Sequence, residues 1–176
     1  MVDTASIEDD AMPQVALREF DRFLGNLGRL TYSWTNTESL LIHLIAGLTG
    51  TSKEKAVIIY LTLNTTRARI DLVERLAKLD DVDKNERNAL LALTGKTQRL
   101  AGLRNLYSHC IYSFDNDSGD LATIQMRIAD RRNAVKVGQM SALDSDTNKA
   151  IETSLEEIAD LNAEYWARIA EFGYPV

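Results

Sequence analysis

Apolar residues recur at helical spacing along most of this chain, which predicts a mainly α-helical fold. From about residue 14 to residue 49 they return every three or four positions, as on one face of a long helix. We expect a single helix here that ends at Thr49-Gly50, and if this helix is broken, the break should fall near Gly25 or Gly28. A second long stripe runs over about 144–172.

Three shorter helices are predicted between these two, at about 51–61, 65–79 and 84–109. Each begins beside a residue whose side-chain oxygen can accept hydrogen bonds from the first free N–H groups of a helix. The predicted caps are Thr51, Asn64 or Thr65, and Asp83. The last helix should stop at Gly173, because Pro175 prevents its continuation.

The pattern changes between residues 112 and 140. Residues 115–120 are turn formers, residues 121–128 alternate apolar with polar, and residues 134–140 do so more loosely. This predicts a small β-hairpin or meander inserted before the C-terminal helix. The fold class expected is therefore all-α, an antiparallel bundle of four or five helices with one β-hairpin at about 112–140.

Length and composition indicate one domain at 13–176, preceded by a flexible acidic N-terminus at 1–12. The broad apolar stripes favour a homodimer formed through a helix pair. A single cysteine, Cys110, allows no internal disulfide, and the acidic N-terminus does not resemble a signal peptide, so a cytoplasmic protein is expected. The longest apolar stretch is too short to span a bilayer, and no membrane association is expected.

The candidate chemistry lies in the segment Arg104-Asn105-Leu106-Tyr107-Ser108-His109. Arginine binds phosphate oxygens through a planar fork, and histidine transfers protons near neutral pH. On a regular helix the Arg104 and His109 side chains would point about 140° apart. The pair can therefore act on one phosphate if the helix ends near Tyr107, or if two chains each contribute one residue at a two-fold axis.

This Arg-x4-His motif, with a polar residue after the arginine, resembles that of the HEPN superfamily (higher eukaryotes and prokaryotes nucleotide-binding domains). The resemblance implies a metal-independent endoribonuclease whose site forms across a dimer. His109 would be the general base or acid for attack of the ribose 2′-hydroxyl, Arg104 would stabilise charge on the phosphoryl oxygens, and Asn105 would orient the site. The products would carry 2′,3′-cyclic phosphate ends. A toxin or defence role, with an antitoxin-like protein partner, is also implied.

Further residues are predicted to support this site. Glu38 lies on the apolar stripe of the first helix, where it either pairs with Arg104 or Arg67 or lies at the edge of the stripe. The predicted substrate-binding residues are Arg67, Tyr107, Arg131 and Arg132, of which the last two belong to a basic patch on the hairpin. A net charge of −6 argues against broad nucleic-acid binding, and DNA is not expected as a partner.

Other interpretations remain open. The Arg104–His109 pair can be structural, in a non-catalytic HEPN-like module that binds a nucleotide or protein partner. A magnesium-dependent hydrolase would use Glu156, Glu157 and Asp160. Three cysteine and histidine residues are too few for an ordinary zinc site, so no metal and no cofactor is expected. Toxins of the family that act beside nucleotidyltransferase antitoxins have a tyrosine two residues after the histidine, where this chain has Ile111.

Overall fold

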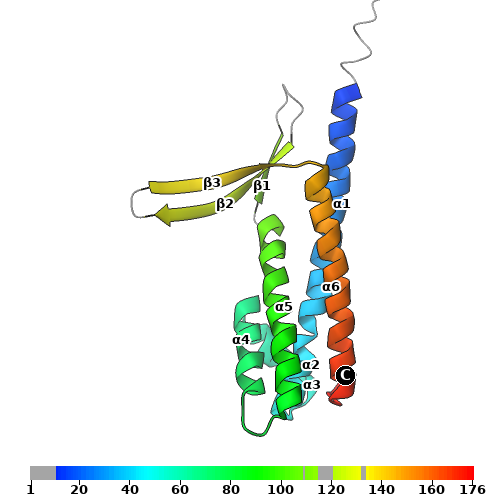
Figure 1. Cartoon of the computed structure of the whole chain (residues 1–176), viewed down its shortest axis with the longest axis vertical. Helices are drawn as coiled ribbons and strands as arrows, with labels where there is room; N and C mark the ends of the chain where they lie inside the picture. Colours follow the sequence, from blue (N-terminus) through cyan, green and yellow to red (C-terminus); the bar gives the residue numbers. More distant parts are fainter. Residues whose placement is uncertain (1–10, 109, 115–120, 132–133) are drawn as a thin grey trace, which may run out of the picture. The chain divides into compact units, whose positions relative to one another are not determined.

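A computed structural model of the chain describes residues 11–108, 110–114, 121–131 and 134–176. These parts are mostly helical and include a small three-stranded antiparallel sheet (Figure 1). Of the N-terminal segment predicted at 1–12, residues 1–10 lie outside the described residues. The elements in chain order are α1 (Ala11–Ser39), α2 (Leu41–Thr49), α3 (Lys53–Thr62), α4 (Thr66–Ala77), α5 (Lys84–Ser108), β1 (Cys110–Phe114), β2 (Leu121–Arg131), β3 (Ala134–Ala142) and α6 (Ser145–Glu171).

The chain divides into two compact units. One, which we call the sheet unit, comprises residues 1–30 and 105–153, and the other, the helical unit, comprises residues 31–104 and 154–176. The helices α1, α5 and α6 each contribute residues to both units.

The helical unit is built around apolar side chains with almost no exposure to solvent. Within it, α2 packs against α3 and α4. All of its elements contribute to the core, including Leu41 and Leu44 of α2, Ile70 and Val73 of α4, Leu90 and Leu93 of α5, and Ile158 and Tyr165 of α6. The core positions repeat at the predicted helical spacing, so burial of one stripe per helix stabilises this unit.

The first helical stretch is interrupted at Leu40, and not at Gly25 or Gly28 as predicted. Both glycines lie inside α1. The Ser39 hydroxyl donates to the Asn36 carbonyl at 2.7 Å, and the Leu40 N–H donates to Thr37 O at 3.1 Å. Bonds of this kind compete with the regular helical ladder and tighten the backbone. The helix thus changes course at a serine rather than at a glycine.

The helix caps agree with the predictions at two of three places. Thr65 accepts from Ala68 N–H at 3.1 Å, and Asp83 accepts from Asn85 N–H at 2.7 Å. The cap of α3 is Ser52, which accepts from Lys55 N–H at 3.5 Å, so the predicted Thr51 is wrong by one residue.

The predicted C-terminal stops at Gly50 and Gly173 are confirmed. Both residues adopt left-handed backbone, with φ of 60° and 65°. This conformation is easily reached only without a Cβ atom. After Gly173, the N–H of Tyr174 donates to Ile169 O at 3.0 Å, which closes the end of α6.

The sheet unit contains the β excursion, in the order β1-β2-β3. Ile111 pairs with Ile124, and Thr123 pairs with Ser141, while the register shifts between Gln125 and Ile128. Of the two predicted forms, the meander describes this sheet better than a simple hairpin. The predicted turn at 115–120 lies outside the described residues.

Side chains from α1 and α6 also meet within the sheet unit. Asn26, which is buried, donates from its amide to Asn148 at 3.3 Å and to Glu152 at 3.2 Å. Asn148 in turn donates to the Glu19 carboxylate at 3.0 Å. The two buried asparagines, Asn26 and Asn148, are thus both hydrogen-bonded, as burial requires.

Among the described residues, none of the helices combines the length and the apolar character needed to cross a membrane.

Candidate functional site

Arg104 lies in the last turns of α5 and belongs to the helical unit. Its Nη2 donates to the Thr66 hydroxyl at 3.1 Å, and its guanidinium carbon lies 5.4 Å from the centre of the Trp34 ring (Figure 1 shows α4 and α5). Its Nε is buried and has no hydrogen-bond partner among the described residues. No carboxylate of the described part of the chain forms an ion pair with it. Within the described part of the chain, the guanidinium is therefore held by a hydroxyl and an aromatic face and not by a carboxylate.

Glu38 fixes the indole on which Arg104 lies. The Trp34 Nε1–H donates to one Glu38 oxygen at 3.0 Å, and Arg69 Nη1 donates to the other at 2.9 Å. The Glu38 and Arg69 side chains are 8% and 17% exposed. The predicted pairing of Glu38 with Arg104 or Arg67 is thus wrong, because Arg69 of α4 occupies that position.

Arg69 donates hydrogen bonds to Tyr60 as well as to Glu38. It donates to the Tyr60 carbonyl at 3.2 Å and to its hydroxyl at 3.2 Å, and its guanidinium carbon lies 3.9 Å from the ring centre. Burial raises the pKa of Tyr60, the Glu38 charge raises it further, and Arg69 opposes this shift. Arg69 is therefore a structural cation, whereas Arg104 is not neutralised in this way.

The other residues of the motif belong to the sheet unit. Asn105 is exposed on α5. Tyr107 is half-buried and packs edge-on against Phe23 with ring centres 6.5 Å apart. Burial, with a smaller effect of Cys110, raises the pKa of Tyr107, which keeps its phenol neutral. The Tyr107 carbonyl accepts from the Tyr112 hydroxyl at 2.7 Å. Tyr107 thus has a packing role, and its role in substrate binding stays a prediction.

The predicted catalytic histidine, His109, lies outside the described residues. The helix α5 ends at Ser108 and the strand β1 begins at Cys110. The predicted end of the helix at about 109 is therefore close to the observed one.

Of the predicted binding cations, the structure describes the side-chain contacts of Arg67. Arg67 is exposed and pairs with Asp71 of its own helix at 2.7 Å. Arg131 is the last residue of β2, and Arg132 lies outside the described residues. The structure thus brings Glu38, Trp34 and Arg104 together, and does not bring Arg67 into this group.

Two residues of the site, Thr66 and Arg69, were not predicted as members. Trp34 and Glu38 are four residues apart, and this spacing places them on one helix face, which is a usable sequence signal. Which arginine of α4 reaches Glu38 depends on the rotation of α4 about its axis, and the sequence alone does not give that rotation.

The remaining histidine and the cysteine have structural partners. His43 is buried, its Nδ1 lies 2.6 Å from the Pro175 carbonyl, and its ring lies 5.3 Å from that of Trp166. Cys110 donates from Sγ to Leu106 O at 2.7 Å, and burial raises the pKa of its thiol. Both arrangements agree with residues that stabilise the fold rather than react.

No group of three or more potential metal ligands occurs among the described residues. Of the acidic set on α6, Glu157 pairs with Arg99 of α5 at 3.0 Å, while Glu156 and Asp160 are exposed. Comparison of the chain with protein-family models, with curated proteins and with solved structures found no match.

Proposed function

We propose that this chain is a HEPN-like, metal-independent endoribonuclease. In this proposal the helices form an antiparallel bundle that dimerises, and Arg104, Asn105 and His109 act on one phosphodiester. His109 takes the proton from the ribose 2′-hydroxyl, the 2′-oxygen bonds to phosphorus as the bond from phosphorus to the 5′-oxygen breaks, and the 5′-oxygen takes a proton from water. The result is a 2′,3′-cyclic phosphate and a 5′-hydroxyl.

The observation that carries the proposal is the environment of Arg104. A half-buried guanidinium normally has a carboxylate partner, because removing a charge from water is unfavourable. Arg104 has a hydroxyl and an indole ring in its place among the described residues, with one N–H left unbonded. A phosphate group would supply the negative charge that the described residues do not.

The surroundings of Trp34 support the same conclusion. Its indole is held by Glu38, and Glu38 is held by Arg69, so the face beneath Arg104 is fixed before any ligand binds. Preorganised positive charge is what stabilises charge developing on a phosphoryl group. The buried ion pair thus serves as a support for the cation of the motif.

Cleavage of a mixed-sequence RNA in EDTA tests the proposal. Wild type should cut to cyclic-phosphate ends, and His109→Ala and Arg104→Ala should each lower the rate about 100-fold or more. Arg99→Ala is the matched control, because Arg99 is an exposed cation on the same helix as Arg104 and pairs with Glu157, and it should cut nearly as wild type does. Absence of cutting by wild type, or equal cutting by all variants, would refute the proposal.

Light scattering tests the dimer in the same preparation, since a site shared between two chains requires one. Co-expression with the protein encoded beside it would test the toxin role, with relief of growth arrest as the expected result. Neither experiment depends on the identity of the RNA.

A non-catalytic nucleotide-binding module is the second candidate. It is favoured by the two contacts that Arg104 already makes, with Thr66 and with Trp34, which suit a fixed ligand contact as well as a catalytic group. This candidate predicts nucleotide binding that Arg104→Ala weakens, with no cleavage by the wild type.

A further inference from the structure

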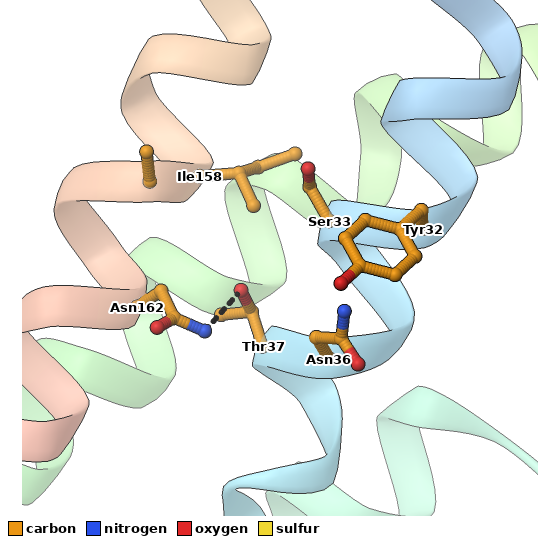
Figure 2. A pocket seen from close by; sticks show the side chains of 7 residues that line it. Tyr32, Ser33, Asn36, Thr37, Ile158 and Asn162 are labelled. Atoms are coloured by element: carbon orange, nitrogen blue, oxygen red, sulfur yellow. Dashed lines mark hydrogen bonds between the residues drawn. The ribbon is translucent and has the colours of Figure 1, made fainter.

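A pocket of about 290 Å³ opens between α1 and α6 within the helical unit. Figure 2 shows side chains of α1 on one side and Ile158 and Asn162 of α6 on the other. The lining residues are Tyr32, Ser33, Asn36, Thr37, Ile158, Ala159 and Asn162. None of these carries a charge, so a ligand bound chiefly through phosphate or carboxylate is not expected here.

The polar groups of the pocket are all uncharged. Two carboxamides, from Asn36 and Asn162, stand with three hydroxyls above an apolar floor that includes Ile158. The Asn162 amide donates to the Thr37 hydroxyl at 3.0 Å, which holds it in place and leaves its carbonyl oxygen available. The Asn36 carboxamide forms no hydrogen bond with another described residue. The two carboxamides can therefore both donate hydrogen bonds to a ligand and accept them from it.

Tyr32 adds an aromatic face. Its side chain is 73% exposed although it lines the pocket, so a planar group can stack on the ring without displacing core residues. Carboxamides that read donor and acceptor edges, together with an aromatic platform, are the means by which proteins bind unpaired bases of single-stranded RNA. The volume is near the lower end of ligand pockets, about 300–1,000 Å³, which suits one base rather than a whole nucleotide.

We infer that this pocket binds an unpaired nucleobase of the RNA, with adenine preferred because asparagine matches its neighbouring acceptor and amino group. This inference rests on the proposed function in taking RNA as the source of the base. Tyr32 and Trp34 point about 160° apart on one helix. The bound base therefore belongs to a nucleotide other than the one whose phosphate meets Arg104.

Binding of adenosine and of a non-cleavable 2′-O-methyl oligoadenylate, followed by saturation-transfer NMR and fluorescence anisotropy, tests the inference. Asn36→Ala and Tyr32→Ala should each weaken binding of both ligands about fivefold or more, with saturation on the base protons. Thr35→Ala is the control, because Thr35 is exposed on the same helix and does not line the pocket. It should bind as wild type does.

The outcomes separate this inference from the proposed function. Wild type that cuts RNA but binds no adenosine, or variants that bind both ligands unchanged, would overturn the base pocket alone. Weakened binding of adenosine but not of the oligonucleotide would assign the pocket to a free nucleoside and overturn its role in RNA binding. A wild type that binds both ligands through Asn36 and cuts no RNA would leave the base pocket standing and refute the nuclease.

Discussion

Glu38 and Arg69 form a buried ion pair that joins α1 to α4, with Arg69 Nη1 2.9 Å from the Glu38 carboxylate. The second oxygen of the same carboxylate accepts from Trp34. One acidic side chain thus satisfies two donors on different elements. Such a group is expected to influence both stability and the position of the Trp34 ring.

Removal of Arg69 should strongly destabilise the protein. Arg69→Ala leaves the Glu38 carboxylate buried without its cation, and we expect the free energy of unfolding to fall by about 3–5 kcal/mol. Urea denaturation followed by circular dichroism measures this. Arg67→Ala breaks an exposed pair on the same helix and should lower it by less than about 1 kcal/mol. Equal losses in the two variants would contradict a special role for the buried pair.

Gly47 should not tolerate even a methyl group. A Cβ atom at this position would lie 2.1 Å from the Tyr174 ring, which is itself buried. Gly47→Ala should therefore lower the free energy of unfolding by about 1–3 kcal/mol, because the ring must move. Gly95 lies in α5 with nothing within 4 Å of its Cβ position, and Gly95→Ala should raise stability by about 0.5–1 kcal/mol. The same sign of change in both, measured by urea denaturation, would be inconsistent with this contact.

The buried hydroxyls of Thr97 and Tyr165 should respond unequally to mutation. Thr97 donates to Leu93 O at 2.8 Å, so Tyr165 must donate to Thr97, at 2.7 Å. Tyr165→Phe removes one donor and should lower the free energy of unfolding by about 0.5–1.5 kcal/mol. Thr97→Val leaves the buried Tyr165 hydroxyl without its acceptor and should lower the free energy of unfolding by about 1–3 kcal/mol. Thermal or urea unfolding of the two variants compares them, and the reverse order would show that the donor is assigned wrongly.

The cap of α6 should make stability depend on acidity. The pKa of Asp144 lies below its usual value of 3.8, chiefly because the Thr147 N–H donates to it, with the Thr147 hydroxyl adding. Folding favours the ionised carboxylate. Its contribution to the free energy of unfolding is therefore present above pH 3.8 and is lost as the pH falls through the lowered pKa of the folded state. Asp144→Asn keeps an acceptor that does not titrate. Its urea midpoint should decline less steeply than that of wild type below about pH 4, and superimposable profiles would exclude this effect.

Helix positions were the most predictable part of the fold. Thr65, Asp83, Gly50 and Gly173 act through local backbone bonds, and such signals are complete within a few residues of sequence. The break at Leu40 was missed because it arises from the Ser39 hydroxyl rather than from glycine flexibility. The strand β1 begins at Cys110, two residues before the predicted start of the β segment, because five residues are too few for a clear alternation to mark the boundary.

The candidate site could be predicted only where one helix carries it. Arg104 and Glu38 were identified from the sequence, yet their partners Thr66 and Arg69 come from α4. Pairing across helices depends on how each helix is rotated about its axis, and periodicity fixes this only to within a residue or two. Tyr32 and Asn36 were not singled out because polar residues on an exposed helix face usually contact only water.

The neutral surroundings of Arg104 have a consequence for ionic strength. The chain carries a formal net charge of −6, so a polyanion is repelled at long range and attracted only close to such a cation. Added salt screens the repulsion as well as the attraction. An RNA ligand should then be bound with a shallow dependence on salt, unlike the steep dependence of basic proteins that displace many counterions. Recognition by this protein would rest on a few well-placed contacts and not on bulk charge.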